Sequence, residues 1–255
     1  MKHIDRKLFQ RSFESESLPE WTCPQCNVGK LIAKEGSIKK QEYRDSLSAR
    51  EHDEWEPFWI RGNFSGRLIC NSEKCGGTMI VAGEMSVETS YDAKDGMGYV
   101  ELFVPKYFDP PLKVLHVNFG LPKKVAESLD DSFRSFWFDA AACANKMRIV
   151  VEMIMDFHRL KKWTTDKKGK KKPIALHHRI TEFKKKRQDV GDLLEAIKWI
   201  GNDGSHELND LFHSDIIEAY EILYLALEKL YGSHAEELLK RAKQINKRKG
   251  LRRRK

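Results

Sequence analysis

Four cysteines in two pairs are the residues of this 255-residue chain best suited to chemistry. Two residues separate Cys23 from Cys26, and four separate Cys70 from Cys75. A tight turn between two cysteines lets both thiolates reach one ion, and structural Zn²⁺ takes four such ligands in a tetrahedron. The spacing therefore predicts one closed zinc site of the zinc-ribbon type. Two disulfides, or four unrelated buried thiols, are the alternatives.

The residues next to each cysteine pair suit such turns. Pro24 stiffens the first turn and Gly29 follows it, while Gly76 and Gly77 give the longer second turn its conformational freedom. The fifth cysteine, Cys143, lies in an apolar stretch without a basic neighbour in sequence. We therefore expect it to be a small core residue and not a nucleophile.

A polar segment after Ile200 is the second candidate for chemistry. Residues 201–206 read Gly-Asn-Asp-Gly-Ser-His, and their two glycines disfavour a continuous helix. A helix end here would present Asn202 and His206 together, and a histidine can act as acid, base or donor near neutral pH. The alternative is structural: Asn202 and Gly204 cap a helix while His206 bonds a backbone carbonyl.

Positive charge is concentrated in two segments. The chain carries a net charge of +8, yet residues 161–187 hold twelve Lys/Arg against two acids, and residues 240–255 hold ten against none. The rest of the chain is therefore acidic. Basic segments of this kind either contact phosphate backbones or are simply solvated. RNA or DNA is accordingly a candidate partner for both.

The first half of the chain has the pattern of β-strands. Residues 58–117 are rich in alternating branched and aromatic residues, beginning with a strand at 58–60, and the second cysteine pair interrupts them. Residues 37–56, between the cysteine pairs, are polar and charged. We interpret them as an insertion over the ribbon, with a helix or loop at 42–50.

The second half has apolar residues at helical spacing. A Lys/Gly-rich loop is expected at 164–172, and the tail after residue 237 is expected to be disordered. The expected helices cover residues 123–129, 131–160, 174–186, 190–200 and 215–231.

These patterns predict an α+β chain in which a small β-rich zinc-ribbon domain (1–117) precedes an all-α bundle (118–235) and a basic tail (236–255). No apolar stretch approaches the roughly 20 residues of a membrane helix. Charges at residues 2–7 stand where a signal peptide has its apolar core. We expect no membrane contact and, with the thiols reserved for metal, a cytoplasmic location.

Three passages resemble a known family. Residues 197–206 contain the pattern Lys-x-x-Gly-Asn-x-x-x-His, which is similar to the signature of the domain-of-unknown-function family DUF4145. Residues 141–152 resemble that family's helix of small residues ending in an Arg and a Glu four apart. The entry at 108–111 and the preceding cysteine pairs also match its layout. The resemblance covers residues 21–231.

That family is similar to the wider HEPN superfamily (higher eukaryotes and prokaryotes nucleotide-binding). The resemblance implies a HEPN-like helical bundle, a homodimer, and a relation to metal-independent ribonucleases of toxin or phage-defence systems. Their motif is an Arg, a polar residue and three further residues before a His. This chain has Asn202 and His206 but carries Gly201 in place of the arginine. Lys198, one helical turn upstream, can place a positive charge on the same helix face as Asn202.

Two further groups have two interpretations each. Arg148 and Glu152 either flank His206 within the bundle or form an ion pair that ties two helices together. His177 and His178 suggest catalysis, but no partner spacing supports it, so we expect surface residues of a basic helix.

Three functions follow from these expectations. The first is a zinc-containing, nucleic-acid-associated protein of a bacterial defence or regulatory system, non-catalytic or conditionally active. The second is a HEPN ribonuclease that uses His206, Asn202 and Lys198. The third is an assembly adaptor that binds a partner protein from the same operon.

Overall fold

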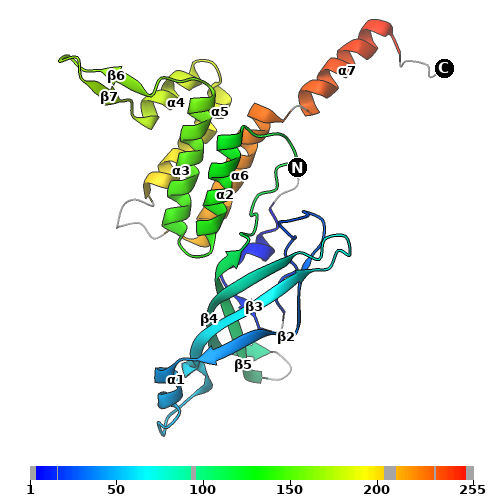
Figure 1. The fold of residues 1–255 in the computed structure, drawn as a ribbon, viewed down its shortest axis with the longest axis vertical. Coiled ribbons are helices and arrows are strands. Elements are labelled where there is room, and N and C mark those ends of the chain that lie inside the picture. The colour runs from blue at the N-terminus through cyan, green and yellow to red at the C-terminus, as the bar shows by residue number, and fades with distance from the viewer. Residues whose placement is uncertain (1–3, 16, 93–95, 204–210, 233, 251–255) are drawn as a thin grey trace.

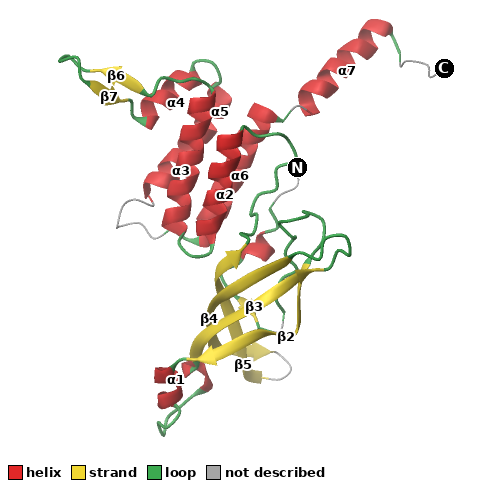
Figure 2. Cartoon of the chain, viewed as in Figure 1, coloured by secondary structure: helices red, strands yellow, loops and turns green. Residues whose placement is uncertain are grey.

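The chain forms a β-rich unit followed by a helical unit (Figures 1 and 2). The structure is a computed structural model that describes residues 4–15, 17–92, 96–203, 211–232 and 234–250. Its mixed content, an antiparallel sheet and then helices, confirms the expected α+β class. The first unit contains η1 (Arg6–Phe9), β1 (Phe13–Glu14), β2 (Leu31–Glu42), α1 (Arg44–Ala49), η2 (Pro57–Trp59), β3 (Arg61–Cys70), β4 (Thr78–Asp92) and β5 (Gly96–Asp109).

The five strands pair antiparallel in the order β1-β5-β4-β3-β2. The expected insertion at 37–56 is corrected in part, because β2 continues through residues 37–42. Its pairing with β3 runs from Leu31 opposite Cys70 to Glu42 opposite Gly62, with one irregularity between Ala33 and Ile38. A polar strand of this kind is stable at the edge of a sheet, where its outer side faces water.

The expected strand at 58–60 is also corrected. Pro57 opens a short 3₁₀ turn, which its fixed φ angle favours. This turn packs beside α1 through Ser46, whose hydroxyl donates to the Trp59 carbonyl at 3.3 Å and accepts from the Arg61 amide at 3.0 Å. Both elements therefore cover the end of the sheet that lies away from the cysteines.

The helical unit contains α2 (Lys123–Phe136), α3 (Ala140–Phe157), α4 (Leu176–Lys184), α5 (Gln188–Asp203), α6 (His213–Tyr231) and α7 (His234–Arg248). The expected helices at 123–129 and 131–160 are corrected, because the break falls at 137–139 and not at residue 130. Asp139 starts α3 by accepting the Ala142 amide at 2.8 Å. Trp137 lies in this break and is buried, with its ring against Phe136 of α2 and Phe108 of β5.

Two further expectations about the second half are corrected. The expected loop at 164–172 is an antiparallel hairpin, β6 (Trp163–Thr165) and β7 (Lys171–Pro173), which extends away from the bundle (Figure 1). The expected disordered tail forms α7, which also projects from the body (Figure 1). Within the described residues, every helix is too short or too polar to cross a lipid bilayer.

Aromatic rings join the two units. The ring centroid of Trp137 lies 6.2 Å from that of Trp21 and 5.0 Å from that of Phe108, both of the β-rich unit. On the surface, the guanidinium of Arg6 pairs with Glu221 of α6 at 2.6 Å. The buried apolar residues of both units consequently form one continuous core.

Candidate functional site

The four predicted cysteines meet at the end of the sheet nearest the helical unit. The Sγ atoms of Cys23 and Cys75 are 3.9 Å apart, and those of Cys26 and Cys70 are 3.7 Å apart. All four sulfurs lie within 4.8 Å of one another. None of them is in a disulfide, which sets aside the two-disulfide alternative.

Two turns closed by backbone hydrogen bonds bring the sulfurs together. In the first, the amide of Cys23 donates to the Gly29 carbonyl at 2.8 Å. In the second, the amide of Cys70 donates to the Gly77 carbonyl, also at 2.8 Å. Lys30 and Asn71 join the turns, because the Lys30 amide donates to Asn71 Oδ1 and the Asn71 amide to the Lys30 carbonyl. Each turn therefore holds its cysteine pair at a fixed position relative to the other.

Backbone amides also point at the sulfurs. The Gly29 amide donates to Cys26 Sγ at 3.3 Å. The amides of Gly29 and Val28 lower the pKa of Cys26 to about 6, because they stabilise its thiolate. This is the protonation state that a metal ligand requires.

Two glycines leave room for the cluster. A Cβ atom at Gly29 would overlap Cys70 Sγ, and one at Gly77 would lie 3.1 Å from Cys75 Sγ. Gly76 has a φ of 56°, which an L side chain rarely adopts. The glycines next to each cysteine pair are therefore part of the site.

The geometry fits a metal ion. Four thiolates that each bind Zn²⁺ at about 2.3 Å in a tetrahedron stand roughly 3.8 Å from one another. The two measured separations match this value. Four sulfurs leave a tetrahedral ion no open position for substrate, so the site is suited to a structural and not a catalytic role.

The polar segment after Ile200 is described only in part. Lys198 is in α5 and is 7% exposed, with its Nζ atom 2.9 Å from the ring centroid of Trp199. Burial lowers the pKa of Lys198, Glu195 raises it and Arg148 lowers it further. Asn202 is half-buried near the end of α5, one turn after Lys198. His206 lies outside the described residues.

The surroundings of Gly201 leave no room for a side chain. A Cβ atom at this position would lie 2.7 Å from the Arg148 Cβ and 2.9 Å from the Ala144 carbonyl oxygen, both of α3. The helices α3 and α5 approach so closely here that no side chain fits. An arginine side chain at position 201 would require α3 and α5 to move apart.

Among the described residues, the Arg148 ion pair lies within α3 and does not link two helices, which corrects that interpretation. Its guanidinium pairs with Glu152 of the same helix at 3.2 Å and donates to Asn145 Oδ1 at 3.4 Å. His177 and His178 are exposed, as expected of surface residues. His177 Nδ1 lies 3.1 Å from Glu195 Oε1.

The hairpin β6–β7 is an element that the sequence pattern did not predict. Asp166 builds its turn, because its Oδ1 atom accepts the amides of Lys168 and Lys170, each at 2.8 Å. Gly169 has a φ of 77° in that turn. The short strands carry only two β-branched residues, Thr164 and Thr165, and this signal was too weak to distinguish a hairpin from a loop.

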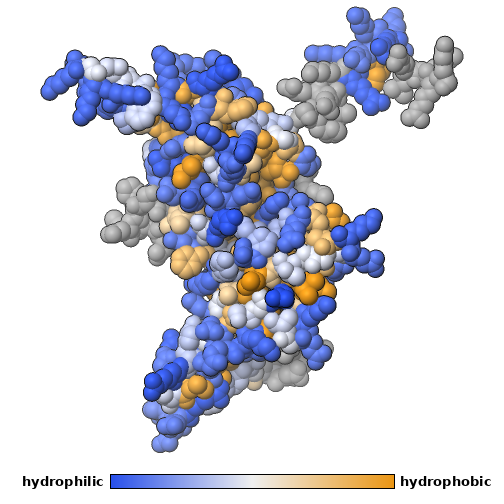
Figure 3. Space-filling view, in the orientation of Figure 1, coloured by the Kyte–Doolittle hydropathy of each residue, from blue (hydrophilic) through white to orange (hydrophobic). Residues whose placement is uncertain are grey.

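The hairpin presents positive charge to solvent. Every residue from 161 to 173 is exposed, and Figure 3 shows this projection as hydrophilic. Five of its lysines form no ion pair with a described residue: Lys167, Lys168, Lys170, Lys171 and Lys172. Lys171 lies over the half-exposed ring of Trp163, with Nζ 4.7 Å from the centroid. At the base, Lys162 and Arg179 both pair with Asp156, which fixes the hairpin to α3.

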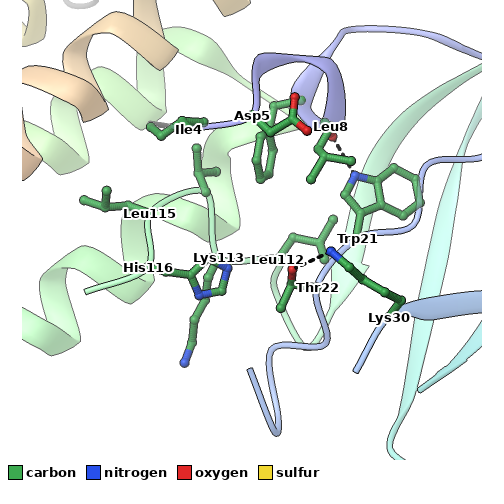
Figure 4. A pocket seen from close by; sticks show the side chains of 12 residues that line it. Ile4, Asp5, Leu8, Trp21, Thr22, Lys30, Leu112, Lys113, Leu115 and His116 are labelled. Atoms are coloured by element: carbon green, nitrogen blue, oxygen red, sulfur yellow. Dashed lines mark hydrogen bonds between the residues drawn. The ribbon is translucent and has the colours of Figure 1, made fainter. Parts of the chain in front are cut away.

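A hollow near the first cysteine pair lies between the N-terminal segment and the segment 112–116 that follows β5 (Figure 4). Apolar side chains such as Leu8 and Leu112 form much of its wall. Two of its donors are already bonded: Trp21 Nε1 donates to the Leu8 carbonyl at 2.6 Å, and Lys30 Nζ donates to Thr22 Oγ1 at 3.2 Å. The hollow therefore lies among segments that pack against the sheet, and these two donors are not available to a ligand.

Two known protein families match separate parts of the chain. Residues 130–248 match the domain of unknown function DUF4145, which confirms that resemblance for the helical unit but not for the cysteine pairs and the sheet before it. Residues 11–108 match a second domain of unknown function, DUF8608. Neither the curated proteins nor the solved structures include a match. The helical unit is thus similar to DUF4145, and the sheet with its cysteines is similar to DUF8608.

Proposed function

We propose that this chain is a zinc-containing, nucleic-acid-binding protein of a bacterial defence or regulatory system, in which the helical unit is non-catalytic or conditionally active. The hairpin β6–β7 supplies the contact, and zinc bound by the four cysteines holds the β-rich unit together. The HEPN-like bundle contributes the scaffold and, as in the proteins it resembles, a dimer interface.

The observation that carries this proposal is the unpaired charge on the hairpin. Its one acid, Asp166, is used in the turn, while five lysines extend into solvent without an acidic partner among the described residues. A rigid ribbon loses less conformational entropy on binding than a flexible lysine-rich loop does. Trp163 adds an aromatic surface on which an unpaired base can stack.

Zinc is supported by the donor set. Four thiolates at tetrahedral separations favour Zn²⁺ over Mg²⁺ or Ca²⁺, which prefer oxygen ligands. When bound, zinc supplies cross-linking and no substrate chemistry. Cys23 and Cys26 hold one side of the ion, and Cys70 and Cys75 hold the other.

The non-catalytic reading is supported by the surroundings of Lys198 and Gly201. A phosphate undergoing cleavage needs cations that can reach it, yet Lys198 is almost fully buried. The arginine that would stand at position 201 in a HEPN ribonuclease has no space beside α3.

Fluorescence anisotropy with labelled RNA and DNA oligonucleotides at low salt tests this proposal. The triple variant Lys167→Gln, Lys168→Gln, Lys170→Gln should lose at least tenfold in affinity, because three phosphate contacts disappear. A matched control replaces three exposed lysines outside the hairpin: Lys34→Gln, Lys39→Gln and Lys124→Gln. An equal loss of affinity in both variants would mean that nucleic-acid binding depends only on the net charge of the chain and not on the hairpin.

The same samples distinguish the other two functions. Gel analysis of the RNA should show no cleavage by the pure protein; cleavage that disappears in His206→Ala would favour the ribonuclease. An absence of binding at low salt would favour the adaptor. Light scattering measures the dimer that the resemblance implies.

A further inference from the structure

The hairpin β6–β7 has two different faces. Side chains two positions apart lie on the same face of a strand, and residues directly opposite each other in neighbouring strands share that face. Trp163 lies opposite Pro173. Thr165 lies opposite Lys171 on the same face, while the other face carries a threonine and a lysine. The one aromatic ring of the hairpin therefore shares its face with a lysine.

Trp163 is available for binding because it is not one of the side chains that form the core. It is 50% exposed on a projection that extends away from the bundle (Figures 1 and 3). Lys171 Nζ lies over its ring, 4.7 Å from the centroid, at the distance of a cation–π contact. This contact orients the indole, and half of the side chain remains in water.

A nucleobase with an open face is the ligand that such a ring accepts. Every base has a π face, so stacking on an aromatic side chain tolerates any base sequence. In a duplex those faces are stacked on neighbouring bases, and only the base edges face the grooves. A ring can reach a duplex base only after the duplex is unstacked, which costs free energy that a single strand does not require. Trp163 therefore favours a single strand.

The lysines of the turn lie at a suitable distance from Trp163. Residues 163–166 rise by about 10 Å at roughly 3.4 Å per residue. One nucleic-acid strand has a phosphate about every 3.4 Å along a helix axis, so about three nucleotides cover the same length. Lys167, Lys168 and Lys170 are exposed there and form no ion pair with a described residue. A strand with one base on Trp163 can therefore place its next phosphates beside these lysines.

We infer that the Trp163 face of the hairpin binds single-stranded nucleic acid, with one base stacked on the indole beside Lys171 and the adjoining phosphates on the lysines of the turn. This inference rests on the proposed function and adds the class of nucleic acid to it. The alternative occupant is the major groove of a duplex, which admits a two-stranded ribbon. The test below distinguishes the two.

Fluorescence anisotropy with three labelled DNA probes tests the inference on the zinc-loaded full chain. The first is a strand of about twelve thymidines, a length within the site sizes of single-strand binders. The second is an abasic strand with the same number of phosphates, and the third is a GC-rich duplex of the same length. The thymidine strand should bind at least fivefold more tightly than the abasic strand, because only the thymidine strand has bases to stack.

Replacement of the ring should remove that difference. Trp163→Leu should weaken binding of the thymidine strand at least fivefold, to the affinity of the abasic strand. Its duplex affinity and the salt dependence of its binding should not change, because Trp163 carries no charge and releases no counterion. Trp163→Phe keeps a ring and should recover most of the lost affinity. Both variants should melt near the temperature of the natural chain, because Trp163 lies outside the core.

Tyr91→Leu is the matched control. Tyr91 is an aromatic residue of β4 that is 80% exposed and lies outside the hairpin. This variant should bind all three probes as the natural chain does. An equal loss of affinity in Tyr91→Leu and Trp163→Leu would mean that stacking is not specific to the hairpin, which would overturn the inference.

The remaining outcomes separate this inference from the proposed function. Suppose that the variant Lys167→Gln, Lys168→Gln, Lys170→Gln loses affinity while Trp163→Leu binds the thymidine strand normally. The inference would then be wrong, and the proposed function would stand. Equal weakening of duplex and single-strand binding in Trp163→Leu would place the hairpin in a duplex groove and would also overturn the inference. An absence of binding to every probe at low salt would contradict both.

Discussion

Gly29 lies so close to Cys70 that no side chain fits between them. The same glycine donates its amide to Cys26 and its carbonyl accepts the Cys23 amide, so one residue serves three of the four cysteines. A site of this kind depends on backbone geometry as much as on the thiols.

Replacement of Gly29 tests this dependence. Gly29→Ala should lose most of its metal and melt at a lower temperature, because the added Cβ displaces the Cys70 sulfur. The natural chain should carry one zinc per chain by elemental analysis. Gly98→Ala is the control, since a Cβ there meets nothing within 4 Å. A Gly29→Ala protein with a full equivalent of zinc would contradict the cluster geometry.

The second prediction about a glycine concerns Gly201 and the stability of the fold. An exposed helical glycine replaced by alanine gains about 1 kcal/mol. Gly201→Ala should instead lose about 1–3 kcal/mol of unfolding free energy, because its Cβ would meet Arg148 and Ala144 of α3. Urea unfolding followed by circular dichroism measures the difference. A stabilised Gly201→Ala would show that α3 and α5 are farther apart.

Among the elements, the hairpin β6–β7 is separable from the bundle that carries it. Trp163 pairs with Pro173, so the two strand ends are already neighbours. Asp156 holds the base through Lys162 and Arg179 and does not depend on the tip.

Shortening the hairpin therefore removes most of its charge while the bundle remains folded. Replacement of residues 165–171 by Asn-Gly closes the strands with a two-residue turn, because the Lys172 amide can donate to the Thr164 carbonyl across it. The melting temperature should change by no more than a few degrees, whereas nucleic-acid affinity should fall at least tenfold. A collapse of the melting temperature would mean that the hairpin supports the core.

The sequence predicted elements where the pattern was strong. The cysteine spacing identified all four members of the cluster, because two turns and one ion leave little freedom. The helical spacing located α4, α5 and α6 to within a few residues. It failed at Trp137, because an aromatic residue that leaves a helix to pack on a sheet has the same spacing as one that stays.

Other parts of the site depend on contacts between distant segments. The hydrogen bonds between Lys30 and Asn71 join residues 41 positions apart, and no local pattern indicates them. The edge strand β2 is polar because one of its sides faces water, so its sequence pattern is that of an insertion. The projecting helix α7 formed where charge alone suggested disorder.

At the scale of the whole molecule, positive charge lies on two projections and the body is acidic. The hairpin and α7 extend from the helical unit in different directions (Figure 1). Residues 240–255 hold ten Lys/Arg and no acid. Phosphate binding by either projection releases counterions, so affinity must fall as salt rises.

The salt dependence of nucleic-acid affinity tests the central claim most directly. For the full chain, log Kd plotted against log salt should rise steeply. In the hairpin-shortened chain, which lacks four lysines, the slope should be smaller by about 2.8 to 3.6. A chain ending at residue 239 measures the share of the tail in the same way. An unchanged slope in the hairpin-shortened chain, or no binding by the full chain at low salt, would contradict the account.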